Sequence, residues 1–444
     1  MRAGPLGQAE VVPEEVLTAP RVITGSETVA DGAVVLGDRL VSWAGRAQAL
    51  PEEYAGLPRT DYPGATILPG LIDSHVHLGF DGGPDPAARM QAETDEQQLV
   101  LMLRNARDLL GVGVTTARDL GARSFLGVVA RDAIASGLAR GPRLVVATRP
   151  VTVTGGHCWF MGGEADSEDD LRRIVRTHHK HGADLIKVMA TGGFMTSGSA
   201  PWYAQFTTGQ LAVIVAEAGR VDMAVAAHAH GLEGIRRAVA AGVTTIEHCS
   251  WVTETNERFF DEPLAAEIAE RGIVVCPTIN VNAPYVTELT GITVGENVRR
   301  MWETGVRIIA GTDAGIDNTP HHQYAGGLAA MVSLLGFSPA EVIAMATTEA
   351  ATALGLGAVT GRLAAGYEAD LIVVDSDPLA DIAALGRLRR VVARGRDYVP
   401  DSGRFDVSAP GTPFASPDHA VDVRRLIEAT RLRQPGGRVR PGDP

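Results

Sequence analysis

Short runs of hydrophobic residues recur through the middle of the chain, roughly from residue 67 to residue 357, and polar residues close most of them. Eight such runs occur, in ATILPGLIDSHVHL, GVTTARDLG, RLVVATRPVT, ADLIKVMATGG, DMAVAAHAHG, GVTTIEHCS, GIVVCPTIN and VRIIAGTDAG. Their length and composition predict short strands. Between them, the segments DEQQLVLMLRNARDLLG, SEDDLRRIVRTHHKHG, TTGQLAVIVAEAGR and LEGIRRAVAAG have helical spacing, and we expect a C-cap glycine to close each.

Eight strands that alternate with helices over ~290 residues predict an α/β protein with a (β/α)8 TIM barrel, a fold that typically spans ~250 residues. A doubly wound open sheet is the structural alternative. It would not readily explain why polar residues gather at so many strand C-termini. The barrel is therefore the predicted fold of residues 67–357.

The two ends of the chain have a different pattern, in which apolar pieces are short and are broken by turn residues. The pattern extends from about residue 22 to residue 66 and returns in TGRLAAGYEADLIVVDSDPLADI and RLRRVVARGRDYVP. We predict that residues 1–66 and 358–400 meet in one small β-sandwich domain. Residues 401–444 form a C-terminal extension, in which HAVDVRRLIEATRLR predicts a surface helix.

The composition is that of a globular protein: 45% of the 444 residues are hydrophobic and 21% are charged. A net charge of −13 argues against nucleic acid or an anionic membrane as the main partner. Three scattered cysteines, Cys158, Cys249 and Cys276, are too few for a disulfide framework and fit a reducing compartment. No secretory signal or membrane span is evident, so we expect a cytoplasmic enzyme.

Residues that can bind metals stand at the ends of five of the eight predicted strands. In a TIM barrel these ends carry the catalytic groups. Each residue alone is a weak signal, because a strand histidine is often a core residue and a strand-end aspartate often caps a helix. Nitrogen and oxygen ligands together suit Zn²⁺, Mn²⁺, Co²⁺ or Fe²⁺. The predicted ligands are His75, His77, Lys187, His228, His248 and Asp313.

Lys187 is the most informative of these residues, since 38 of the 40 basic residues are Arg and only Lys180 and Lys187 are Lys. An ammonium group repels cations, but an amine can react with CO₂ to give an anionic carbamate, which Arg could not form. Lys187 could instead reach a surface ion pair. Lys180 belongs to the run at 178–181, His-His-Lys-His, which lies late in a predicted helix and which we interpret as surface.

Four further residues are candidates for contact with a substrate. His157, in the glycine-rich segment TGGH, could donate to a developing oxyanion, although a plain loop histidine is nearly as good an interpretation. His230 comes two residues after His228 on the same predicted strand, so both side chains point the same way. This favours a place for His230 in the site. Tyr203 and Arg118 are weaker candidates for binding a substrate carboxylate, and Arg118 could equally form a structural ion pair.

The motifs PGLIDSHVHL, DLIKVMATGG, AAHAHG, TTIEHCS and GTDAG resemble the metal motifs of the amidohydrolase superfamily. The resemblance is closest to its prolidase-like branch of dipeptidases, carboxypeptidases and ochratoxin-hydrolysing amidases, and GYEADLIVVDSDPL resembles the β-sandwich of that branch. It implies that His75, His77 and Asp313 hold a buried metal. It further implies that a carbamate on Lys187 bridges to a second metal, held by His228 and His248.

Two departures from the pattern of the branch leave the substrate open. His228-Ala229-His230-Gly231 stands where many relatives have His-Ala-Tyr-Gly, so His230 either takes the role of that tyrosine or leaves it vacant. The segment HHQYAGG stands where relatives usually carry a small polar run that leads to a Glu-containing helix.

These observations predict a binuclear hydrolase that cleaves the amide bond of a dipeptide or an N-acyl amino acid. Two ions, first of all Zn²⁺, at ~3.5–4 Å would lower the pKa of a bridging water toward ~7. Asp313 would accept its proton and pass it to the departing amine. The alternatives are a mononuclear deaminase or cyclic-amide (imidazolone-type) hydrolase, and a non-catalytic scaffold, which the complete ligand set disfavours. We expect a small-molecule amide substrate and a homo-oligomer.

Overall fold

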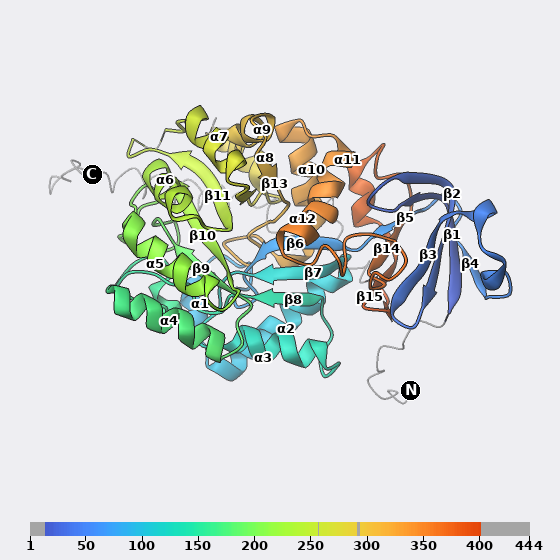
Figure 1. Ribbon diagram of the computed structural model, residues 1–444, viewed down its shortest axis with the longest axis horizontal. Coiled ribbons are helices and arrows are strands. Elements are labelled where there is room, and N and C mark those ends of the chain that lie inside the picture. Colours follow the sequence, from blue (N-terminus) through green and yellow to red (C-terminus); the bar gives the residue numbers. More distant parts are fainter. Residues whose placement is uncertain (1–13, 256, 291–293, 401–444) are drawn as a thin grey trace, which may run out of the picture.

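Eight parallel strands form the centre of the computed structural model, which describes residues 14–255, 257–290 and 294–400 (Figure 1). A three-stranded sheet has the order β6-β7-β8, and a five-stranded sheet has the order β13-β12-β11-β10-β9. Each of these strands begins in one of the eight predicted hydrophobic segments, and only β11 extends past its segment, by two residues, so the predicted succession is confirmed. The strands are β6 (Leu71–Val76), β7 (Val114–Asp119), β8 (Arg143–Val146), β9 (Leu185–Met189), β10 (Ala224–Gly231), β11 (Thr245–Val252), β12 (Val274–Cys276) and β13 (Arg307–Ile308).

Main-chain hydrogen bonds connect the two sheets at both of their outer edges. After β8, Val151 donates its N–H to the carbonyl of Lys187 and accepts one from Met189, both at 2.8 Å. At the other edge, Asp313 donates its N–H to the carbonyl of His75 at 2.8 Å. The strands therefore follow one another around a TIM barrel, as predicted.

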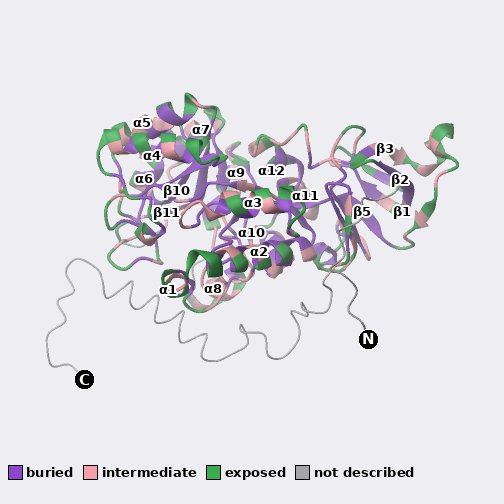
Figure 2. Cartoon of the chain, turned by 90° about the horizontal axis from the view of Figure 1, so that it is seen from below, coloured by how far each residue is buried: buried purple, intermediate pink, exposed green. Residues whose placement is uncertain are grey.

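Helices separate the strands and cover the outside of the barrel, where Figure 2 shows exposed positions, while the strands inside are buried. Capping boxes begin several helices, at Thr94, Ser167, Thr207 and Ser338. The helices are α1 (Pro86–Ala92), α2 (Asp95–Gly111), α3 (Leu126–Ala135), α4 (Glu168–Lys180), α5 (Thr208–Gly219), α6 (Leu232–Ala241), α7 (Glu262–Glu270), α8 (Ala283–Thr290), α9 (Glu296–Glu303), α10 (Tyr324–Leu335), α11 (Pro339–Met345) and α12 (Thr348–Ala353).

The predicted glycine C-caps are correct only in part. Gly242 ends α6 with a φ of 79° in the left-handed region, where glycine is favoured. Gly182, just past α4, has a φ of 81°. The prediction is wrong for α2 and α5, because Gly111 and Gly219 are their last helical residues and the C-caps are Val112, with a φ of −105°, and Arg220, with a φ of −69°.

Strands from both ends of the chain form a separate, eight-stranded sheet (Figure 1). Its path is β16-β15-β14-β5-β1-β2-β3, and β4 pairs with β1. Two separate apolar clusters pack on this sheet. One contains Leu17 and Val34, and the other contains Val16 and Val35. The strands are β1 (Glu15–Ile23), β2 (Thr28–Gly37), β3 (Leu40–Arg46), β4 (Arg59–Asp61), β5 (Thr66–Pro69), β14 (Leu371–Val374), β15 (Leu388–Ala393) and β16 (Arg396–Tyr398).

The chain ends thus meet in one β-structure, as the sequence pattern predicts, and β5 spans the predicted domain boundary at residues 66 and 67. The boundaries themselves stay predictions. The predicted surface helix HAVDVRRLIEATRLR lies outside the described residues. Within the part of the chain that the structure describes, no helix has the length and apolar character to cross a membrane. The cytoplasmic location and the homo-oligomer stay predictions.

Candidate metal centre

The strand register brings Lys187 and His228 onto one face of the five-stranded sheet. Lys187 lies beside Ala226, and Met189 lies beside His228. Because side chains alternate along a strand, Ala226 and His228 point the same way, and the side chain of Lys187 points with them. Lys187 is 1% exposed, and burial is the main cause that lowers the pKa of its amine. This placement excludes the surface ion pair that the sequence left open.

His75, His77 and Asp313 form the first group of candidate ligands. Oδ1 of Asp313 lies 3.3 Å from Nε2 of His75 and 3.2 Å from Nε2 of His77. Nδ1 of His77 faces the carbonyl of Gly121 at 3.2 Å, which leaves Nε2 for a ligand. Nζ of Lys187 lies 3.5 Å from Nε2 of His75 and therefore adjoins this group.

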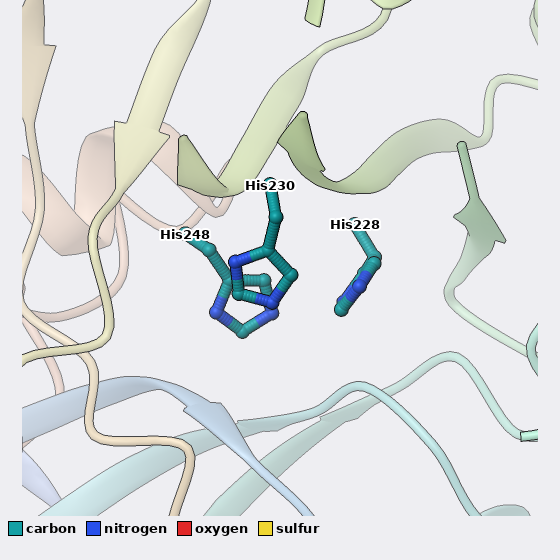
Figure 3. A group of neighbouring side chains, drawn as sticks. All are labelled: His228, His230 and His248. Carbon is teal, nitrogen blue, oxygen red and sulfur yellow. The ribbon is translucent and has the colours of Figure 1, made fainter. Parts of the chain in front are cut away.

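His228, His230 and His248 form the second group, which Figure 3 shows with all three rings close together. The ring centroids of His228 and His248 are 4.6 Å apart, and those of His228 and His230 are 4.7 Å apart. The ring of His248 also lies 5.1 Å from that of His75, so the two groups adjoin. The six ligands predicted from the sequence therefore converge at one place, together with His230.

Each ring of the second group uses one nitrogen for a contact with the protein. Nε2 of His228 faces the carbonyl of Gly192 at 3.0 Å. Nδ1 of His248 faces Oγ1 of Thr278 at 2.8 Å. Burial, followed by the neighbouring imidazoles, lowers the pKa of His228 and of His248 well below the ordinary value of histidine. Neutral imidazoles with one oriented nitrogen are the form in which histidine binds metals.

Two of the candidate ligands have backbone conformations that are uncommon for residues other than glycine. His248 has a φ of 69° and Asp313 a φ of 61°. Between β10 and β11 the register also shifts, since Ala229 pairs with His248 but Gly231 pairs with Val252. Such bulges re-aim side chains, and left-handed residues of this kind concentrate at functional sites.

A buried carboxylate that the sequence reasoning missed supports His75. Oε2 of Glu247 accepts from Nδ1 of His75 at 2.9 Å, and Oε1 accepts from Arg118 at 2.8 Å. Burial opposes the charge of Glu247, but Arg118 and His75 outweigh it and lower its pKa to about 2. Arg118 is 3% exposed, which favours the structural ion pair over binding of a substrate carboxylate.

The remaining candidates differ in burial. His157 is 4% exposed, its ring lies 4.7 Å from that of His228, and its Nδ1 lacks a hydrogen-bond partner in the described chain. Burial, with the charge of Lys187, lowers the pKa of His157 to about 3. Tyr203 is 47% exposed, and its ring packs on that of Trp202 at 6.0 Å. His157 therefore faces the centre, and Tyr203 is the most exposed of the candidates.

The run at 178–181 is at the surface only in part. His179, Lys180 and His181 are exposed, as predicted. The surface interpretation is wrong for His178, which is buried because α4 packs it against the barrel. Its two ring nitrogens lie 2.7 Å from the carbonyl of Ile174 and 2.8 Å from that of Arg149.

Two residues near the site were not among the candidates named from the sequence. Arg258 follows β11 and forms an antiparallel bridge with Val252. Nη1 of Arg258 is buried, and this atom has neither a hydrogen bond nor an ion pair within the described residues. The charge of Arg258 is among the causes that lower the pKa of His230. His321, in the unusual segment HHQYAGG, faces the carbonyl of His77 through Nε2 at 3.2 Å.

Comparison with known proteins identifies the class to which this fold and centre belong. The sequence matches the Amidohydrolase family over residues 66–396, and the chain belongs to that family. The resemblance and the hydrolase class expected from the motifs are thereby confirmed. The protein is a hydrolase that acts on carbon–nitrogen bonds, in a family that generally binds divalent metals.

Individual relatives agree with this class. The chain is 28% identical to ochratoxinase of Aspergillus niger over 386 residues, which is 80% of each protein. It is 26% identical to imidazolonepropionase of Ruegeria sp. (strain TM1040) over 385 residues, 80% of this chain and 89% of that one. A solved Xaa-Pro dipeptidase with bound methionine superposes with a TM-score of 0.78 at 28% identity, covering 87% of this chain and all of the other.

Proposed function

We propose that the protein is a binuclear metal-dependent hydrolase that cleaves the amide bond of a dipeptide or an N-acyl amino acid. One observation carries the proposal: two groups of candidate ligand residues adjoin at His75, beside the buried amine of Lys187. Lys187 approaches His75 to 3.5 Å, and the rings of His75 and His248 are 5.1 Å apart. His75, His77 and Asp313 would hold one ion, His228 and His248 the other, and a carbamate on Lys187 would bridge them.

The residues present fit a pair of divalent ions. Oδ1 of Asp313 is buried without a hydrogen bond in the described chain, a costly state for a carboxylate that lacks a cation. The ligand rings are oriented by their second nitrogens, as metal-bound histidines usually are. A set of imidazoles and carboxylate-type oxygens suits Zn²⁺ first, and Mn²⁺, Co²⁺ or Fe²⁺ also.

Ions bound here would supply a water of lowered pKa as nucleophile and would polarise the substrate carbonyl. Asp313 would accept the proton of the nucleophile and deliver it to the departing amine. His157, neutral and without a partner on Nδ1, would donate to the carbonyl oxygen as negative charge develops, an effect typically worth ~10²–10³ in rate. His230 and Tyr203 complete the candidates at the mouth of the site.

A substrate with a free carboxylate fits the charges around the centre. Arg258 is a half-buried cation without an acidic partner within ion-pair distance in the described chain, and its charge acts on His230. Dipeptides and N-acyl amino acids carry such a carboxylate beside the scissile amide. The names of the similar Xaa-Pro dipeptidase and ochratoxinase support the same substrate class.

A mononuclear deaminase or cyclic-amide (imidazolone-type) hydrolase is the second candidate. The similarity to imidazolonepropionase, over 80% of this chain, favours it. The two candidates differ in their need for Lys187, because a single ion requires no bridging ligand.

The deciding experiment measures bound metal per chain and amide hydrolysis in the wild type and in Lys187→Ala. Lys180→Ala is the matched control, since Lys180 is the other lysine of the chain and is exposed. We expect about two ions per wild-type chain, a loss of at least one ion with ~10³-fold lower activity in Lys187→Ala, and no change in the control. One ion per chain and full activity without Lys187 would support the second candidate instead.

A further inference from the structure

We propose that His230 is a third histidine ligand of the ion held by His228 and His248. The inference rests on the proposed function, because it concerns one of the two ions assigned there. It changes the role of His230 from a contact for the substrate to a part of the metal site.

The local sequence places His230 and orients it. His228 and His230 are two residues apart on β10, and their rings lie 4.7 Å apart and nearly perpendicular, at 83°. The neighbouring strand β11 provides Ser250, whose Oγ faces Nδ1 of His230 at 2.9 Å. This contact leaves Nε2 as the nitrogen available to a ligand, the arrangement that supports a metal-bound imidazole.

The geometry of the three rings distinguishes His230 from the other histidine nearby. The ring of His230 stacks on that of His248 at 4.3 Å and 18° and is 9% exposed (Figure 3). One nitrogen from each of His228, His230 and His248 lies within 4.8 Å of the other two. Binding of one ion by all three would require the stacked ring of His230 to rotate relative to that of His248. His157 has the same ring distance to His228, 4.7 Å, yet in the described chain it belongs to no group of this kind.

The simpler interpretation is that His230 is a neutral histidine packed in the wall of the site. It accounts for the stacking but not for the pattern of hydrogen bonds. Each ring faces the protein through one nitrogen, Nε2 of His228 toward Gly192 and Nδ1 of His230 and His248 toward Ser250 and Thr278, and each has one nitrogen left. Because neutral imidazoles gain little from facing each other, a shared cation explains the arrangement better.

With three imidazoles, the second subsite, formed by His228, His230 and His248, has a ligand set different from that of the first subsite, which is formed by His75, His77 and Asp313. Apart from the carbamate proposed on Lys187, its side-chain ligands are nitrogen atoms, whereas the first subsite includes the carboxylate of Asp313. Imidazole ligands favour Zn²⁺, Co²⁺ or Ni²⁺ over Mg²⁺ or Ca²⁺. The ion at His230 is therefore held more tightly, and with fewer positions left for substrate, than two histidines alone would allow.

The test compares His230→Gln with His157→Gln in the full-length protein. Zinc affinities come from competition with a chromogenic chelator, and the ligand field is read from the visible spectrum of the cobalt-substituted protein. We expect His230→Gln to bind one of two zinc ions at least about tenfold more weakly, with a changed cobalt spectrum. His157→Gln keeps both affinities and the wild-type spectrum, although its hydrolysis is impaired.

Ser250→Ala is a milder second variant, which leaves all three rings in place and removes only the contact at Nδ1. We expect it to weaken the same ion several-fold. Wild-type zinc affinities and cobalt spectra in both His230→Gln and Ser250→Ala, however low their activity, would overturn the inference and return His230 to substrate contact. If the wild type binds a single ion, the binuclear function fails, and the effect of His230→Gln on that ion still decides the role of His230.

Discussion

The candidate histidine ligands of this centre are oriented one residue at a time by contacts to one of their two ring nitrogens. His77 is oriented by a carbonyl group, and His75 by the carboxylate of Glu247. A carboxylate at this position has the stronger influence, because its negative charge increases the basicity of the ring. Arg118 in turn forms a buried ion pair with Glu247. Arg118, Glu247 and His75 therefore form a buried chain of charges that reaches the first subsite.

Replacing Glu247 by Gln tests this chain of charges. The amide keeps the size of the side chain but removes the charge between His75 and Arg118. We expect zinc affinity at the first subsite or activity to fall about 10–100-fold. We also expect about 3–5 kcal/mol lower stability, because the buried guanidinium of Arg118 loses its counter-charge. Chelator competition and urea unfolding measure the two effects.

The control for this variant is Glu233→Gln, which alters an exposed carboxylate paired with Arg236 and Arg237 on α6. Ion pairs at the surface contribute about 0–1 kcal/mol, so this change should leave zinc binding intact and stability nearly so. Equal behaviour of the two variants would show that Glu247 has no special part in the centre.

At the scale of elements, the strands and the first ligands could be predicted because they obey simple periodicities. His75 and His77 share a face through the two-residue repeat of a strand. Glu247 and His248 are adjacent, and that repeat would place them on opposite faces. The left-handed φ of 69° at His248 and the register shift between β10 and β11 bring both toward the centre. Such a local departure follows from packing between strands and has no signature in the sequence.

The segment that follows β11 and pairs with its end leads to a further prediction. Arg258 lies on it, and its buried Nη1 has no hydrogen bond within the described residues, so we expect Arg258→Met to raise the KM of dipeptides and N-acyl amino acids about 10–100-fold, with less effect on kcat. Steady-state kinetics with a substrate and its carboxamide analogue measure the effect. The KM of the analogue, which lacks the carboxylate, should not respond.

Arg271→Met is the control for this variant, since Arg271 is exposed and pairs with Glu267 on α7. Its kinetics should match the wild type. An unchanged KM for carboxylate substrates in Arg258→Met would remove Arg258 from the substrate site.

Over the whole molecule, buried charges connect the barrel to the sheet built from the chain ends. Nη2 of Arg143, at the start of β8, lies 2.6 Å from Glu368 and 2.9 Å from Asp370. Asp370 is 1% exposed and also accepts from Thr360 at 2.7 Å and from the N–H of Arg394 at 2.7 Å. These partners lie more than 200 residues from Arg143 along the chain. The sequence predicted that the ends meet but offered no pattern from which this contact could be found.

Replacing Arg143 by Met should therefore destabilise the protein without disturbing its chemistry. The variant leaves the carboxylate of Asp370 buried without its cation, which costs about 3–5 kcal/mol, whereas the stem of Met fills most of the space. Catalytic groups of a TIM barrel lie at the opposite ends of the strands, so zinc affinity should match the wild type. Urea unfolding and chelator competition separate the two effects. The double variant Arg143→Met with Asp370→Asn should recover part of the loss, because the uncompensated charge is then absent. If Arg143→Met unfolds at the same urea concentration as the wild type, the charges between barrel and sheet do not stabilise the fold.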